Sequence, residues 1–119
     1  MASKELTVGE GRTQVSLRAE SVGDDLVVTI YNAAAHIGAV AVAEYHQPTG
    51  RASVSVISRP GHKDDIPANQ AAHDICKAIK HPVCVISGIH VDDISTAEIK
   101  QFVANAQQVV AEFIKTLGG

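Results

Sequence analysis

The sequence predicts an α+β domain: one mixed, mostly antiparallel sheet with two helices packed on it, in the order ββββαβα. Two observations support this prediction. Residues 12–58 alternate between apolar and polar side chains, as strands with one buried face do. Residues 64–117 contain two stretches with apolar residues at helical spacing, separated by a short apolar stretch. The length of 119 residues suits a single domain spanning 1–119.

The composition argues against several classes of protein. Hydrophobic residues make up 45% of the chain and charged residues 19%, the balance of an ordinary globular domain. The formal net charge of −3 and the lack of a Lys/Arg cluster argue against nucleic-acid binding. No apolar run approaches the ~20 residues of a membrane span, and Met1–Glu5 has no apolar signal core. We therefore expect a cytoplasmic protein that binds neither membranes nor nucleic acids.

Four strands and a loose N-terminal arm are predicted in the first half of the chain. The arm comprises residues 1–10. The strands are Arg12–Ala19, Leu26–Tyr31, Ile37–Tyr45 and Arg51–Ser58. Turn signals at Gly23–Asp25 and Gln47–Gly50 join them as two hairpins. We expect all four strands to form a meander.

Two helices and a fifth strand are predicted in the second half. Asp64 or Asp65 caps the first helix. Val83–Ser87 is an apolar strand, typical of a buried central position. Ser95–Glu98 has the pattern of a capping box, and it opens a long helix with an apolar stripe over residues 99–114.

Three histidines are expected to meet at one edge of the sheet. His36 lies in the connection after the second strand, and His62 and His90 follow the fourth and fifth strands. A right-handed crossover would make the fifth strand parallel to the fourth, so that all three strand ends share one edge. Ligands of open α/β sheets bind at such edges. The matching segments His62–Asp65 and His90–Asp93 both follow a glycine, which lets the backbone turn or approach a ligand closely.

Two kinds of binding site are compatible with this edge. The first is a phosphate site, because a helix N-terminus attracts anions and Arg59, His62 and Lys63 precede the first helix. The second is a divalent metal site in a small hydrolase-like enzyme, with His62, His90 and Asp92 as ligands. The H-x-D spacing is only a weak metal signature, and aspartates at these positions are also ordinary helix caps.

The sequence also bears on two further functions, nucleophilic catalysis and assembly. Nucleophilic catalysis ranks last, because the chain has no G-x-S-x-G motif and no reactive-looking cysteine, so no catalytic residue is assigned. An assembly role is indicated by Ala39–Ala43, a run that is apolar on both faces of its strand. Such a strand needs cover on both sides, which predicts a homodimer.

Three segments resemble the prenylated-flavin chaperone family, the small D-type accessory subunits encoded beside gallate-type non-oxidative decarboxylases. They are His36–Val40, Arg59–Asp65 and Gly88–Asp93. The similarity extends from about Arg12 to the C-terminus, and the sequences PGHKDD and GIHVD are its most specific part. The resemblance implies a fold similar to that of the proteasome assembly chaperones.

The resemblance also implies a function: a non-catalytic accessory domain over residues 12–117. It would bind prenylated FMN, or FMN, and support a UbiD-like decarboxylase. The sheet-edge argument and the resemblance together give the candidate cofactor-binding residues His36, Gly38, Arg59, Gly61, His62, Lys63, Asp64, Gly88, His90 and Asp92. His62 and Lys63 would contact the flavin phosphate or its bound ion. Tyr31 is the only aromatic residue expected near this edge, so aliphatic residues or a second subunit would supply the wall.

Overall fold

A computed structural model describes residues 3–59 and 64–117 and confirms the α+β class. Its elements are β1 (Ser3–Val8), η1 (Gly11–Thr13), β2 (Val15–Val22), β3 (Asp25–Tyr31), β4 (Ala39–His46), β5 (Arg51–Ser58), α1 (Asp65–Ile79), β6 (Val83–Gly88) and α2 (Thr96–Leu117). The strands of this part of the chain form one sheet in the order β1-β2-β3-β6-β4-β5. Among the described strands only the β3–β6 pair is parallel, so the sheet is mixed and mostly antiparallel, as expected.

The N-terminal segment is a strand, which corrects the prediction of a loose arm over residues 1–10. Ser3–Val8 pairs antiparallel with β2, in a register that runs from Ser3 opposite Glu20 to Val8 opposite Val15. Val8 is buried, and Leu6 packs against the core. An edge strand with one solvent-exposed face needs few apolar residues, so two at alternate positions are enough to hold it in the sheet.

The fifth predicted strand, β6, separates the two hairpins, which corrects the prediction of a four-stranded meander. The β2–β3 and β4–β5 hairpins form as expected. However, β6 pairs in parallel with β3 and antiparallel with β4, so β3 and β4 are not neighbours. The apolar sequence of β6 suits this central position in the sheet, where a strand pairs with it on each side. The strand directions are nevertheless as predicted, and β3, β5 and β6 end at the same edge.

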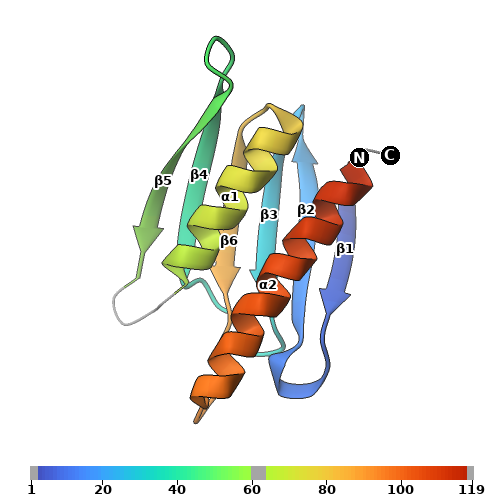
Figure 1. Ribbon diagram of the computed structural model, residues 1–119, viewed down its shortest axis with the longest axis vertical. Helices are drawn as coiled ribbons and strands as arrows, with labels where there is room; N and C mark the ends of the chain where they lie inside the picture. The colour runs from blue at the N-terminus through green and yellow to red at the C-terminus, as the bar shows by residue number, and fades with distance from the viewer. Residues whose placement is uncertain (1–2, 60–63, 118–119) are drawn as a thin grey trace.

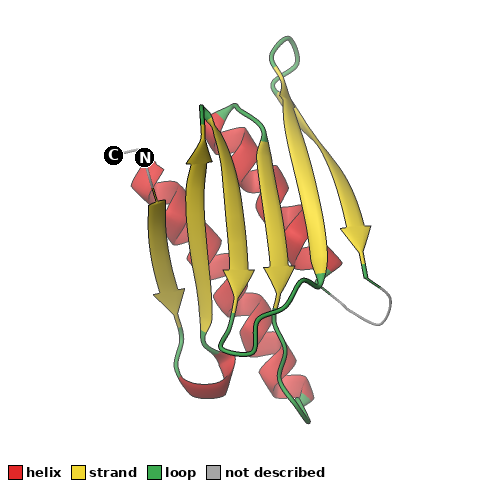
Figure 2. Ribbon diagram, turned by 180° about the vertical axis from the view of Figure 1, so that it is seen from behind, coloured by secondary structure: helices red, strands yellow, loops and turns green. Residues whose placement is uncertain are grey.

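Both helices lie on one face of the sheet (Figure 1). α1 packs on β4, β5 and β6, and α2 packs on β1 and β2. The core lies between the helices and the sheet, and its largest fully buried side chains include Leu17, Ile30, Ile75, Val85 and Phe113. Seen from behind, the described part of the sheet presents a face that no helix covers (Figure 2). Neither helix of residues 3–59 and 64–117 is long and apolar enough to cross a membrane.

The gap between the helices forms an apolar cavity of about 640 Å³. It lies above β3, whose Ile30 forms part of the lining. Ile99 and Val103 of α2 line the same cavity and are 48% and 43% exposed. The predicted apolar stripe of α2 is therefore buried only in part, because its first turns line the cavity that separates α2 from α1.

The start of α2 confirms the predicted capping box. The Ser95 backbone N–H donates to Glu98 Oε1 at 3.1 Å, and the Glu98 backbone N–H donates to Ser95 Oγ at 3.1 Å. These bonds satisfy N–H groups that the helix itself cannot satisfy. α1 begins differently: Asp64 occupies the N-cap position, but its side chain makes no capping hydrogen bond.

Candidate functional site

Four strands end at one edge of the sheet, the lower edge in Figure 1. β3 and β6 run parallel, and β5 shares their direction because both β5 and β6 are antiparallel to β4. β1 also ends here, since β1 and β3 are both antiparallel to β2. As a result, η1 and its Arg12 lie beside the loops that carry His36 and His90. The sequence predicts Arg12 as the first residue of a strand, Arg12–Ala19, whereas in the structure Arg12 lies in η1 and β2 begins at Val15.

The structure brings His36 and His90 together, as predicted. Their ring centroids are 5.7 Å apart, with an angle of 65° between the ring planes. Both ring nitrogens of His36 are buried, whereas the His90 side chain is 53% exposed. His62, the third member of the predicted cluster, lies outside the described residues, as do Gly61 and Lys63. His90 is therefore the member of the pair that a ligand in solvent can reach.

The loop that carries His36 crosses directly over the end of β6. A Cβ on Gly88 would lie 2.5 Å from the carbonyl carbon of His36, and closer still to its carbonyl oxygen. The Gly38 backbone N–H also donates to the Ser87 carbonyl at 2.9 Å. The missing side chain of Gly88 thus makes room for the protein's own backbone, and this crossing fixes His36 above β6.

Asp64 connects the start of α1 to the end of β6. Its side chain is buried, and Oδ1 accepts hydrogen bonds from Ser87 Oγ and from the Ile89 backbone N–H, both at 3.3 Å. A Cβ on Gly38 would lie 2.7 Å from Asp64 Cγ. Asp64, Gly38 and Gly88 therefore form the framework that holds the loops of this edge in place.

Arg59 connects the end of β5 to the same framework. Its backbone N–H donates to the Gly38 carbonyl at 3.0 Å, and its Nη1 donates to the Ile37 carbonyl at 2.7 Å. Arg59 is solvent-exposed. The described residues on either side of segment 60–63, Arg59 and Asp64, therefore both contact this edge.

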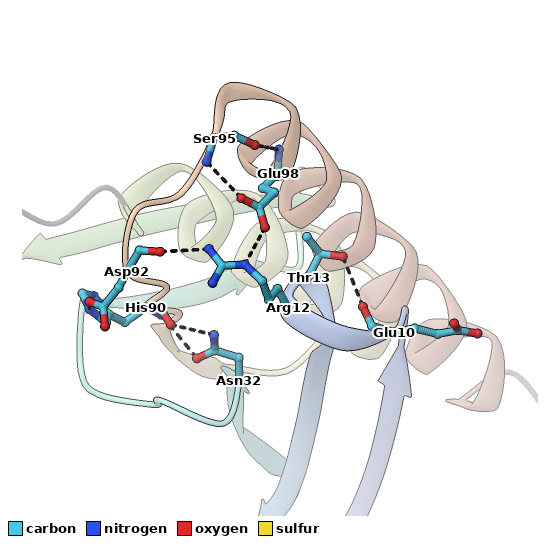
Figure 3. Close-up of polar contacts among 8 residues, drawn as sticks. All are labelled: Glu10, Arg12, Thr13, Asn32, His90, Asp92, Ser95 and Glu98. Atoms are coloured by element: carbon cyan, nitrogen blue, oxygen red, sulfur yellow. Dashed lines mark hydrogen bonds and ion pairs between the residues drawn. The ribbon is translucent and has the colours of Figure 1, made fainter.

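The loop after β6 is held from two sides (Figure 3). On one side, Asn32 Nδ2 donates to the His90 carbonyl at 2.9 Å, and the His90 backbone N–H donates to Asn32 Oδ1 at 3.3 Å. On the other side, Arg12 Nη2 donates to the Asp92 carbonyl at 2.8 Å. Within the loop, His90 Nε2 and Asp92 Oδ1 are 2.9 Å apart. Asn32 and Arg12 were not among the predicted site residues.

Arg12 also connects η1 to the start of α2. Its Nε donates to Glu98 Oε2 at 2.8 Å. This hydrogen bond is the main cause that raises the pKa of Arg12, and Asp92 and Asp93 raise it further by their charge. The same bond is the main cause that lowers the pKa of Glu98 to about 2. The positive charge of Arg12 thus offsets part of the negative charge of Glu98, Asp92 and Asp93.

A cavity of about 260 Å³ adjoins His90. It is lined by η1, by the loop after β3 and by the loop after β6. Its lining residues are Gly11, Arg12, Gln14, Asn32, Ala33, Ala34, His90, Val91 and Asp92. Hydrogen-bonding side chains from three distant segments therefore converge on one small, partly apolar space.

Tyr31 does not provide the aromatic wall considered from the sequence. It lies on the open face of the sheet, where its hydroxyl donates to Glu5. The Arg18 guanidinium lies 5.4 Å from the centroid of its ring. Tyr31 thus faces β1 and β2, and it is not among the residues that line the cavity beside His90.

The metal-site hypothesis receives no support from the structure. Within residues 3–59 and 64–117, no group of three His, Cys, Asp or Glu side chains is arranged to hold a metal ion. Of the three ligands proposed from the sequence, His90 and Asp92 contact each other. The third, His62, lies outside the described residues.

Two comparisons with known proteins agree with the resemblance seen in the sequence. The family model described as the prenylated flavin chaperone LpdD-like domain matches residues 9–118. Among solved structures, the chain is similar to one titled "Crystal Structure of a Novel Chaperone Complex for Yeast 20S Proteasome Assembly", with a TM-score of 0.62 and 15% identity. That match covers 99% of this chain and 97% of the other, and it shows a common fold alone. A search of curated protein sequences finds no match.

Proposed function

Because the chain belongs to the prenylated flavin chaperone LpdD-like family, we propose that it binds prenylated FMN, or FMN, where His36 and His90 meet. In this proposal the protein is not itself a catalyst. It supports the maturation or activity of a UbiD-like non-oxidative decarboxylase. The observation that supports the binding site is the convergence of Arg12, Asn32 and His90 on one cavity.

The cavity fits part of a flavin nucleotide. Its volume of about 260 Å³ is just below the ~300–1,000 Å³ of pockets that enclose drug-sized ligands. The rest of the ligand would lie on the adjoining surface, toward Arg59 and the N-terminus of α1. Half-buried Ile89 and Val91 would supply apolar contact. In this arrangement Arg59, with His62 and Lys63, serves the phosphate.

Titration of the purified protein with FMN and with prenylated FMN, followed by absorbance and fluorescence, tests the binding site. His90→Ala is expected to weaken binding at least tenfold, about 1.4 kcal/mol. His73→Ala is the matched control, because His73 is a solvent-exposed histidine on α1 that also has a carboxylate neighbour, Asp74, at 3.1 Å. Absence of saturable binding by the unaltered protein, or equal effects of the two variants, would contradict the proposal.

The larger cavity between α1 and α2 offers a competing location. It is mostly apolar, and its volume of about 640 Å³ lies within the range of small-molecule sites. Val103→Asp places a charge in its wall and should leave flavin binding unchanged. Loss of binding in Val103→Asp together with normal binding in His90→Ala would place the flavin between the helices instead.

The accessory role can be tested separately. A UbiD-like decarboxylase produced together with this protein should contain a larger fraction of active, cofactor-loaded enzyme than the same decarboxylase produced alone. Co-production with the His90→Ala variant should give less of this gain than co-production with His73→Ala. An active fraction that is the same with and without the protein would argue against a chaperone role for this chain.

We also propose that a second copy of the chain covers the open face of the sheet. Ile57, Val40 and Ile86 lie side by side across β5, β4 and β6, and Ile57 is 74% exposed. Val42, also on this face, is 46% exposed. Contiguous apolar groups on a sheet surface commonly mark an interface between proteins.

Sedimentation velocity tests the dimer. Val42→Glu is expected to shift a dimer to monomers, because it would bury an unpaired charge in the interface. Ile66→Glu is the control, since Ile66 is 72% exposed but lies on α1, on the opposite side of the sheet. A monomeric unaltered protein at micromolar concentration would refute this part of the proposal.

A further inference from the structure

We infer that the cavity beside His90 receives the N–H-bearing edge of a heteroaromatic ring, the imide edge of a flavin, and excludes the phosphate group. This inference rests on the proposed function and adds the orientation of the ligand. It follows from three features of the cavity: the direction of one hydrogen bond, the local charge and the nature of the walls.

The contact between His90 and Asp92 determines what the imidazole can offer a ligand. A carboxylate can only accept a hydrogen bond, so the contact of 2.9 Å between His90 Nε2 and Asp92 Oδ1 places the proton on Nε2. In the neutral ring, Nδ1 then carries a lone pair and accepts a hydrogen bond. Such a group pairs with an N–H donor, and it repels an ionised phosphate oxygen.

The charges around the cavity also oppose phosphate. Arg12 is the cation of the lining, and its guanidinium is already bound to Glu98 and to the Asp92 carbonyl. The carboxylates of Asp92 and Asp93 lie close enough to act on it by their charge. One guanidinium therefore faces three carboxylates, and the surplus of negative charge disfavours a phosphate group.

The walls favour an uncharged ring over a free cation. Ala33, Ala34 and Val91 contribute apolar lining, and a bare cation would lose hydration there without gaining enough ligands. Asn32 also lines the cavity, and its amide nitrogen and oxygen are both paired with the His90 backbone. His90 is thus positioned to contact the ligand, and Asn32 acts through it as a positioning residue.

Three flavins distinguish the two ends of the ligand: FMN, riboflavin, and riboflavin methylated on its imide nitrogen. The unaltered protein is expected to bind the methylated riboflavin at least tenfold more weakly than riboflavin. In His90→Ala this discrimination should fall to about twofold or less, whereas the preference for FMN over riboflavin should persist. His73→Ala should retain both differences, since His73 lies on the helical layer.

The outcomes separate this inference from the proposed function. Equal binding of riboflavin and its methylated form would overturn the orientation while leaving flavin binding intact. Loss of the preference for FMN in His90→Ala would also overturn it, because the phosphate would then lie at this cavity. If none of the three flavins binds, the proposed function fails, and the inference fails with it.

Discussion

Gly88→Ala is expected to destabilise the fold by about 3 kcal/mol, the upper end of the usual ~1–3 kcal/mol for overpacking. The added Cβ would lie 2.5 Å from the His36 carbonyl carbon, whereas real Cβ atoms keep at least 3.0 Å from other heavy atoms. The obstacle is backbone, so no side-chain rotation relieves it. Hydrogen bonds at Ser87 and Ile89, on either side of the substitution, resist a shift of β6.

Thermal and urea unfolding followed by far-UV circular dichroism measure this effect. At ~4 °C per kcal/mol for a domain of this size, the melting temperature should fall by about 12 °C. Gly23→Ala is the control, because a Cβ there meets nothing within 4 Å and only the left-handed backbone at φ +62° opposes it. That strain costs roughly 1–2 kcal/mol. Equal destabilisation by the two substitutions would refute the claim that the backbone crossing at Gly88 is rigid.

Three more substitutions test other contacts. Glu98→Gln should make the stability of the protein fall less steeply on acidification, because the pKa of Glu98 is lowered from 4.5 to about 2 in the folded protein. The ionised Glu98 carboxylate stabilises the fold above pH 4.5, and this contribution is lost as the pH falls toward 2. If the urea midpoints of the variant and the unaltered protein declined equally over this pH range, the prediction would be contradicted. Asn105→Ala should cost about 1–3 kcal/mol by thermal unfolding, because buried Asn105 donates to the Thr13 carbonyl at 2.8 Å; an unchanged melting temperature would show that the bond contributes little. Asp64→Asn keeps an acceptor for Ser87 Oγ and should destabilise less than Asp64→Ala in the same assay, so the opposite order would indicate that charge matters more than hydrogen bonding.

Local signals in the sequence predicted local structure well. The two hairpins were predicted because turn residues sit between alternating strands, and both form. The capping box at Ser95 was predicted because its two partners are only three residues apart. Strand direction followed from the same signals, which is why the meeting of His36 and His90 was also predicted correctly.

Features that depend on distant partners were missed. The place of β6 depends on competition between strands across the whole sheet, and no local pattern encodes that competition. β1 was missed because only Leu6 and Val8 give it an apolar face. Arg12 and Asn32 reach their partners across 80 and 58 positions of the chain. The predicted hairpin of Arg12–Ala19 and Leu26–Tyr31 already placed Arg12 at the edge where the second strand ends, and this was the signal that could have brought Arg12 to the site.

The entry of β6 between two hairpins has a kinetic consequence. Each hairpin closes from segments adjacent in the chain, whereas β6 must pair on both sides with strands synthesised well before it, and such non-local pairing is slow. His36 rests on the last residue of this strand, and His90 follows it. A chain whose hairpins have formed but whose central strand is still outside the sheet would therefore lack the flavin site proposed above. Competence to bind at that site would then be acquired only once β6 has entered the sheet.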